Sequence, residues 1–442
     1  MAIDSLQRPS MPLRGINTSP VAPRPQTLAE TGIPINALLD LTEKHLFEGG
    51  VLTIKDLVQR MAMAGLLIEE LLALLRREGR VEVRAQTPND PSIRLGLTER
   101  GRGSALAALA ANGYVGPVPV TPDVYAEVIR KQSVRSNRVT RAEMRTQFAD
   151  VVIDPHMLDR LGPALNSGKA IFVYGNPGTG KTYVTQRLAR VFDDTCLIPH
   201  AIAVGDTVIR IYDPAVHTRI ESTAANLMLN QGHDPRFVLC RRPVVITGGE
   251  LTADALEVQY DVATRQYRAP LQLKANGGMF ILDDLGRQRV PPEVVLNRWI
   301  VPMEEGVDHL SLQTGQHFSV PFDVVLVFST NLSPSELVDD AFLRRIGYKI
   351  RFDSLREEQY HAIWRGVCEN HDLRYEPEVC QYVIERWHRP TGTALLPCHP
   401  RDLIRMALDH AIYMQFDEKL CRKALDWAWN NYFVSTHAST SS

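Results

Sequence analysis

The stretch that decides the fold of this chain reads Gly175-Asn176-Pro177-Gly178-Thr179-Gly180-Lys181-Thr182. It matches the pattern G-x-x-x-x-G-K-T, in which the backbone N–H groups of a glycine-rich loop surround a phosphate chain. The apolar run 170–174 before it predicts a buried parallel strand, and residues 183–192 after it have apolar side chains at helical spacing. Strand, loop and helix together predict a phosphate site at a helix N-terminus.

The residue types in this loop fit the chemistry of a polyphosphate and its Mg²⁺ ion. Lys181 is expected to reach the β- and γ-phosphates, and the Thr182 hydroxyl is expected to bind the metal. We expect the loop and the first turn of the helix to contact a nucleotide, with these residues: Gly175, Asn176, Pro177, Gly178, Thr179, Gly180, Lys181, Thr182 and Tyr183.

Two further predicted strands end in polar side chains that suit the same site. The apolar run 279–282 is followed by Asp283, expected to hold Mg²⁺, and by Asp284, expected to polarise the attacking water. The run 324–329 leads to Asn331, whose amide is expected to hydrogen-bond the γ-phosphate or that water. The alternatives are structural: a helix cap for the two acids and a strand-end turn for Asn331.

Two adjacent arginines, Arg344 and Arg345, follow the apolar edge of another predicted helix. A guanidinium neutralises charge on a phosphoryl group during transfer, so one of the two is a candidate catalytic residue. The alternative is that both lie on the surface and pair with Asp339 or Asp340.

The order of these motifs resembles that of the AAA+ ATPases, over roughly residues 150–435. The resemblance makes 175–182 the Walker A motif, 279–284 Walker B, Asn331 sensor 1, and Arg344 or Arg345 the arginine finger. It implies that the chain is an enzyme that binds ATP with Mg²⁺, hydrolyses ATP, and forms a homo-oligomeric ring, expected to be a hexamer. It also implies a sensor 2 arginine in a helical lid, for which Arg401 is the candidate.

Two features resemble the AAA+ clade that carries a β-hairpin before sensor 1. The lead-in to Walker B is Leu273-Lys274-Ala275-Asn276-Gly277-Gly278, and the alternation in 308–312 and 317–320 predicts the hairpin. Within that clade the MoxR-like ATPases are most similar, which implies a chaperone acting on a protein client. Two features depart from the pattern: Asp284 replaces the usual Glu, and about a hundred residues separate Thr182 from Asp283, which predicts an insert.

Residues 33–115 predict a winged helix-turn-helix domain, with helices at 35–47, 53–63, 66–78 and 98–111 and strands at 81–83 and 93–97. From Glu69 to Arg102, seven Arg stand against six acids. DNA phosphates favour a clearer basic excess. Docking of a protein is therefore the preferred interpretation, and contact with DNA is the alternative.

The expected organisation comprises a disordered tail at 1–32, the winged-helix domain at 33–115, a basic linker at 116–150, an α/β core with an insert at 151–353, a helical lid at 354–435, and a disordered tail at 436–442. The linker holds six basic residues and one acid between Arg130 and Arg145. A solvated helix or linker is the preferred interpretation, and contact with nucleic acid or another partner is the alternative.

Bulk composition is that of a globular protein with a formal net charge of −2, so no global basic field points to nucleic acid. No apolar run approaches the ~18 residues that span a bilayer, and no signal peptide is recognisable. The six Cys contain no C-x-x-C pair and are expected to be reduced thiols in the cytoplasm.

Three functions remain open at this point. The first is a ring-forming ATPase that remodels or activates a protein partner. The second is a DNA-handling motor or loader anchored by the winged helix. The third is a slowly hydrolysing, ATP-gated regulator, which the shorter side chain of Asp284 keeps open.

Overall fold

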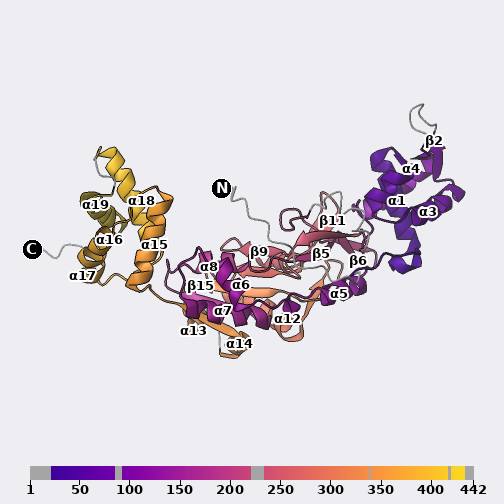
Figure 1. Cartoon of the computed structure of the whole chain (residues 1–442). Helices are drawn as coiled ribbons and strands as arrows, with labels where there is room; N and C mark the ends of the chain where they lie inside the picture. Colours follow the sequence, from indigo (N-terminus) through magenta and orange to yellow (C-terminus); the bar gives the residue numbers. More distant parts are fainter. Residues whose placement is uncertain (1–20, 85–91, 221–232, 338–339, 417–419, 434–442) are drawn as a thin grey trace, which may run out of the picture. The chain divides into compact units, whose positions relative to one another are not determined.

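The structure, a computed structural model, describes residues 21–84, 92–220, 233–337, 340–416 and 420–433 (Figure 1). These residues form two compact units. The first comprises the described residues of Met1–Arg138 with Phe192–Ile281 and Gln288–Leu326. The second comprises those of Val139–Val191, Leu282–Arg287 and Val327–Ser442.

The N-terminal module of the first unit has the elements that the sequence predicts for a winged helix-turn-helix. Its helices are α1 (Ile35–Gly49), α2 (Ile54–Met61), α3 (Gly65–Arg77) and α4 (Glu99–Ala111). Its strands β1 (Val51–Thr53), β2 (Val81–Arg84) and β3 (Arg94–Leu97) form an antiparallel sheet in the order β1-β3-β2. The sequence did not predict β1. It does predict a turn at 89–91, between the two strands of the wing, but these residues lie outside the described ones.

The last third of the predicted N-terminal tail is ordered. It contains a short 3₁₀ turn, η1 (Ala29–Thr31), and both Ala22 and Thr31 are buried. The Ala22 carbonyl accepts a hydrogen bond from the backbone N–H of Asp234 at 2.9 Å. Arg236, in a buried ion pair with Asp234 at 2.7 Å, donates to the Thr31 carbonyl at 3.4 Å. A buried guanidinium needs hydrogen-bond acceptors, and the Thr31 carbonyl is one of them. Together, the hydrogen bonds to the Ala22 and Thr31 carbonyls hold residues 21–32 against Asp234 and Arg236.

The segment expected to be a linker contains α5 (Pro122–Lys131), η2 (Val134–Ser136) and α6 (Arg141–Gln147). One face of α5 is buried through Tyr125, Val128 and Ile129, so this segment is part of the packed structure rather than a spacer.

Several basic residues of this segment pair with acids. Lys131 pairs with Glu127 at 2.7 Å, and Arg141 binds the Asp159 carboxylate at 2.7 Å. These ion pairs favour the interpretation of this segment as a solvated helix over its interpretation as a surface that contacts nucleic acid.

The insert that the sequence predicts consists of small sheets. Strands β6 (Ala201–Val204), β7 (Thr207–Arg210), β10 (Gln259–Asp261) and β11 (Gln266–Arg268) form one sheet in the order β10-β11-β7-β6. Strand β5 (Thr195–Pro199) pairs antiparallel with β8 (Phe237–Arg241). The sequence predicts a single strand over 237–246, but the structure divides it, because β9 (Val244–Thr247) begins after Pro243. The sequence also predicts a helix at 219–230, a stretch that lies almost wholly outside the described residues.

The predicted hairpin is confirmed as β13 (Val307–Ser311) paired antiparallel with β14 (His317–Pro321). Short elements precede it: η3 (Ala253–Leu256), α10 (Leu271–Lys274), α11 (Pro292–Arg298) and α12 (Ile300–Glu305). Gly306, with φ +69°, ends α12 and turns the chain into the hairpin.

The central sheet has five strands in the order β16-β4-β15-β12-β9. Its remaining strands are β4 (Ile171–Gly175), β12 (Met279–Leu282), β15 (Val325–Thr330) and β16 (Tyr348–Phe352). Helix α7 (Pro155–Ser167) precedes β4 and α8 (Lys181–Leu188) follows it, whereas α13 (Pro334–Leu337) and α14 (Asp340–Arg345) lie between β15 and β16. Strand β4 pairs parallel with both β15 and β16, and every residue of β12 and β15 is buried. This confirms the predicted α/β class with a parallel sheet.

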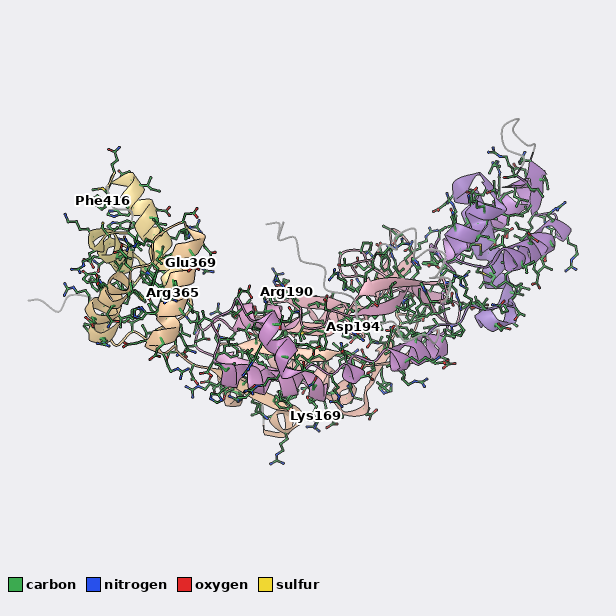
Figure 2. All side chains as sticks on the ribbon, in the orientation of Figure 1. Lys169, Arg190, Asp194, Arg365, Glu369 and Phe416 are labelled. Atoms are coloured by element: carbon green, nitrogen blue, oxygen red, sulfur yellow. The ribbon has the colours of Figure 1, made fainter. Side chains whose placement is uncertain are left out.

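The C-terminal part of the second unit is helical. It comprises α15 (Glu357–Asn370), α16 (Pro377–Val383), the π-helical turn η4 (Ile384–His388), α17 (Arg389–Thr391), α18 (Cys398–Tyr413) and α19 (Arg422–Tyr432). Figure 2 shows Arg365 and Glu369 on α15. The sequence predicts Trp364, Trp387, Trp427 and Trp429 as core residues of this part. Trp364 and Trp429 are buried and Trp387 is partly buried, whereas Trp427 is 41% exposed and stacks on His410. No helix in the described parts of the chain is long and apolar enough to cross a membrane.

Two histidines lie in the core of this helical part. His388 donates from Nδ1 to the Thr393 carbonyl at 3.0 Å, so its Nε2 accepts from the Tyr360 hydroxyl at 3.1 Å. His399 packs edge-on against the rings of Tyr432 and Phe433, and its buried Nδ1 has no hydrogen-bond partner among the described residues. Burial lowers the pKa of His399 to about 4 and lowers that of His388 as well. Both rings are therefore neutral in the folded helical part.

We predict that the helical part loses stability as the pH falls from 6.5 toward 4. The unfolded chain protonates His399 near the ordinary pKa of about 6.5, whereas the folded chain does so near about 4. The unfolded state therefore binds more protons within this window, so its relative stability rises. Four of the five tryptophans lie in this part, and their fluorescence reports its melting temperature. His399→Phe should flatten the fall in melting temperature between pH 7 and pH 5.

The exposed His371 supplies the control, because His371→Phe should leave the pH dependence as in the wild type. An equally steep fall in the His399→Phe variant would contradict the prediction.

Candidate functional site

The phosphate loop lies between β4 and α8, and two of its glycines are required by close approaches. Gly175 has φ +146°, and a Cβ atom there would lie 2.2 Å from the Phe352 carbonyl oxygen at the end of β16. Gly178 has φ +81°, and its Cβ would lie 2.7 Å from Cys398 Sγ. Side chains at either position would therefore displace the neighbouring segment, which explains glycine at both.

The Lys181 side chain is held by three acceptors. Its Nζ donates to the carbonyls of Gly175 at 2.8 Å and Asn176 at 2.9 Å, and to Asn331 Oδ1 at 2.7 Å. Lys181 is 6% exposed, and burial lowers the pKa of its ammonium, while the carboxylates of Asp284 and Asp283 act in the opposite direction. The arrangement places a buried cation beside two carboxylates, which are the charges that a polyanion and a divalent metal each require.

Asn331, directly after β15, connects Lys181 to the acidic pair. Because its Oδ1 accepts from Lys181, its Nδ2 is the donor that reaches Asp284 Oδ1 at 3.2 Å. The structure therefore brings together three residues that the sequence placed at one site: Lys181, Asp284 and Asn331.

The backbone at Asp284 is in the left-handed region, with φ +50°. Its N–H donates to Asp283 Oδ1 at 3.1 Å, and its carbonyl accepts from the Arg287 N–H at 3.0 Å. Aspartate and asparagine tolerate this conformation better than longer residues, because their short polar side chains bond locally. The local backbone thus supplies a reason for aspartate at a position where the resembled family usually has glutamate.

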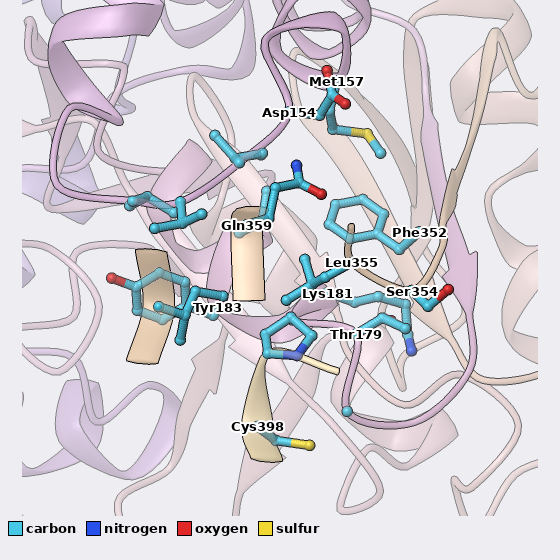
Figure 3. Close-up of a pocket in the computed structure, with 18 of the residues that line it drawn as sticks. Asp154, Met157, Thr179, Lys181, Tyr183, Phe352, Ser354, Leu355, Gln359 and Cys398 are labelled. Carbon is cyan, nitrogen blue, oxygen red and sulfur yellow. The ribbon is translucent and has the colours of Figure 1, made fainter. Parts of the chain in front are cut away.

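A cavity of about 1130 Å³ in the second unit surrounds these residues (Figure 3). Its lining comes from the phosphate loop and α8, from Asp284 and Asn331, from 150–160, from 351–371 and from 397–401. Figure 3 shows Lys181, Tyr183 and Cys398 among the residues around it. The volume is that of a site for a nucleotide-sized ligand.

The sequence did not predict two walls of this cavity. One is Val151–Ile153, before the N-cap Asp154 of α7, and the other is a face of α15 that includes Ile363 and Val367. The apolar triplet ahead of a helix cap is the only sequence signal for the first wall. Both walls are apolar and suit the base of a nucleotide.

The predicted arginines lie in different places. Arg401, on α18, lines the cavity and pairs with Asp402 at 3.0 Å. Arg344 and Arg345 form the last turn of α14 and are not among the residues that line the described cavity. Of their predicted surface partners, Asp339 lies outside the described residues.

The donor set fits Mg²⁺. The Thr182 hydroxyl and the Asp283 carboxylate offer hard oxygen ligands. Across the described ranges, no group of three or more His, Cys, Asp or Glu could hold a metal by itself. Mg²⁺ keeps several waters and takes one or two protein ligands beside phosphate oxygens, a number that Thr182 and Asp283 can supply.

Residues 356–431 match a family model described as a domain of unknown function (DUF8689). This match coincides with the helical part that contains α15 to α19. No curated protein matches the chain.

Among solved structures, the chain is similar to NtrX from Brucella abortus, with 13% identity over 66% of this chain and 54% of that chain, at a TM-score of 0.38. It therefore spans about half of the NtrX chain. It is also similar to a point mutant of RuvB from Thermotoga maritima, with 13% identity over 64% of this chain and 70% of that one, at a TM-score of 0.39. A further structure is titled RuvB Holliday junction branch migration motor, with 15% identity over 70% and 71% and a TM-score of 0.34. Similarities this distant say nothing of a shared substrate or partner.

We predict that Asp284→Asn binds ATP but hydrolyses it at least about a hundredfold more slowly, because an amide cannot accept a proton from water. Asp283→Asn, the matched control, should instead weaken the Mg²⁺ dependence of ATP binding. Calorimetry measures ATP binding and its Mg²⁺ dependence, and phosphate release measures hydrolysis.

The same position yields a second variant, Asp284→Glu. The left-handed backbone should cost this variant roughly 1 kcal/mol of stability and leave hydrolysis no faster than in the wild type. Faster hydrolysis by Asp284→Glu would show that the short side chain of Asp284 limits the wild-type rate.

Proposed function

We propose that the chain is an AAA+ ATPase that binds ATP with Mg²⁺, hydrolyses it, and uses the energy to remodel or activate a protein partner, as a MoxR-like chaperone in the cytoplasm. The observation that carries this proposal is the hydrogen-bonded series Lys181–Asn331–Asp284 inside a nucleotide-sized cavity. The three residues come from the phosphate loop and the ends of two strands, as the chemistry of phosphoryl transfer requires.

In this proposal each residue has one task. Thr182 and Asp283 would hold Mg²⁺, which would neutralise phosphate charge when bound. Lys181 exchanges its present acceptors for the β- and γ-phosphate oxygens. Asn331 keeps the Asp284 carboxylate turned toward the water that attacks the γ-phosphate, and Asp284 accepts the proton of that water.

The helical part is the proposed lid. Arg401 lies in the first turns of α18 and already lines the cavity, so the guanidinium needs only to leave Asp402 for a phosphate oxygen. Because Gly178 of the phosphate loop approaches Cys398 closely, a change in the loop on nucleotide binding is transmitted to α18. This is a physical route from hydrolysis to movement of the lid.

The surface of α3 supports a protein partner over DNA. Leu66 near its N-terminus is 79% exposed, and Glu69 and Glu70 are exposed on the following turn without an ion pair in the described chain. A helix that reads DNA presents its N-terminal residues to the groove, where two carboxylates would meet phosphate repulsion. An exposed leucine beside unpaired acids suits a protein surface that carries basic residues.

The first test is nucleotide binding. Lys181→Ala should lower ATP affinity at least about a hundredfold, because the charge that contacts the phosphates is lost. Lys423→Ala, which removes an exposed lysine of α19, is the matched control and should bind as the wild type does. Calorimetric titration with ATP and Mg²⁺ decides, and equal affinity in both variants would overturn the site.

The second test is assembly. An arginine finger serves the nucleotide of the neighbouring subunit, so the position of Arg344 and Arg345 away from the lining of their own cavity fits this role. Alanine at the true finger should leave ATP binding near normal and lower turnover about a thousandfold. Mixing that variant with Lys181→Ala should restore activity, because some interfaces then combine an intact finger with an intact phosphate loop.

A chain that stays monomeric with ATP in light scattering would contradict ring formation. If activity failed to return on mixing for either arginine, neither would be the finger.

A further inference from the structure

Five arginines line the cavity, and four of them already have partners. Arg351 pairs with Asp353 at 2.7 Å, Arg356 with Asp154 at 3.1 Å and Arg401 with Asp402 at 3.0 Å, and Arg160 donates to the Lys349 carbonyl at 2.9 Å. The fifth is Arg287, whose guanidinium has no hydrogen bond or ion pair with any described residue.

The backbone that carries Arg287 is firmly held. Its N–H donates to the Asp284 carbonyl at 3.0 Å. Leu285 donates to the Ser329 carbonyl at 2.8 Å and accepts from Thr330 Oγ1 at 2.7 Å, so the segment is tied to the end of β15 on both sides. Gly286, between Leu285 and Arg287, has φ +103°, and a Cβ atom there would lie 3.0 Å from Leu332 Cδ1. The loop that positions Asp284 therefore also fixes the backbone position from which the Arg287 side chain extends.

We propose that Arg287 is a further catalytic residue, which contacts the γ-phosphate of the nucleotide bound to its own chain. This rests on the proposed ATPase function. Asp283 and Asp284 offset most of the charge of Lys181 and of a bound Mg²⁺, so a further cation from the cavity wall would be needed to balance the negative charge of ATP. A guanidinium without an acid partner breaks no ion pair when it turns to an anion, unlike those of Arg351, Arg356 and Arg401.

In the reaction, the oxygen of water forms a bond to the γ-phosphorus while the bond from that phosphorus to the β–γ bridging oxygen breaks. The bonding electrons leave with ADP, and the proton of the water passes to Asp284 and then to solvent. Negative charge grows on the bridging oxygen and is spread over the γ-phosphoryl oxygens. Arg287 offers charged N–H donors to the γ-phosphoryl oxygens, so its contact is stronger in the transition state than with bound ATP.

Arg287→Ala should therefore lower kcat about 10- to 100-fold, leave the affinity for ADP unchanged, and weaken that for a non-hydrolysable ATP analogue only slightly. Arg287→Lys should recover part of the loss. The matched control is Arg289→Ala, an exposed arginine two residues further along that does not line the described cavity. Arg289→Ala should turn over at the wild-type rate.

Mixing distinguishes this role from that of a finger. Arg287→Ala mixed with Lys181→Ala should show no more activity than the Arg287→Ala subunits retain by themselves, because no site then holds both an intact loop and Arg287. Recovery of activity, equal rates for Arg287→Ala and Arg289→Ala, or an equal loss of ADP and ATP affinity would each overturn the proposal. Failure of the wild type to bind ATP would overturn the ATPase function itself, and is measured separately by the calorimetry that compares Lys181→Ala with Lys423→Ala.

Discussion

The buried ammonium of Lys181 is the group on which the rest of the site depends. It cannot lie at 6% exposure without acceptors, and it finds them in Gly175, Asn176 and Asn331. These contacts fix the phosphate loop against the end of β15. They also orient the Asn331 amide, and through it the Asp284 carboxylate. One cation thus sets the geometry of an acid that it does not contact.

A steric constraint at the end of β4 supports the same arrangement. In the parallel register Phe352 of β16 lies opposite Gly175, and its carbonyl oxygen leaves no room for a side chain there. The chain that leaves β16 runs directly into the wall formed by 351–371. One close backbone contact therefore couples the end of β16, the start of the phosphate loop and the start of the segment that leads to the helical part. A packed interior transmits small displacements, so a shift of one of these would move the others.

The sequence predicted the parts of the fold that local pattern controls. The phosphate loop, the apolar runs of β12 and β15 and the hairpin of β13 and β14 all have a period or a motif of their own. The helices of the segment at 116–150, which was predicted as a basic linker, were not placed from the sequence, because basic residues surround the few apolar residues of α5 that become buried. In the site, Asp283, Asp284 and Asn331 were predictable because parallel strands end at one edge of a sheet. The walls of the cavity and Arg287 were not, because they come together only through tertiary packing.

Two explanations account for aspartate at position 284, and they differ in whether the left-handed backbone conformation determines the residue type. If the short side chain reflects weak hydrolysis, the chain is a regulator and the conformation at 284 is incidental. If the left-handed φ of +50° sets the residue type, aspartate is chosen because it bonds locally and keeps its carboxylate within reach of Asn331. The hydrogen bonds of Leu285 and Arg287 hold that backbone whether the side chain is short or long. The conformation is therefore a property of the loop, and it favours the shorter acid at position 284.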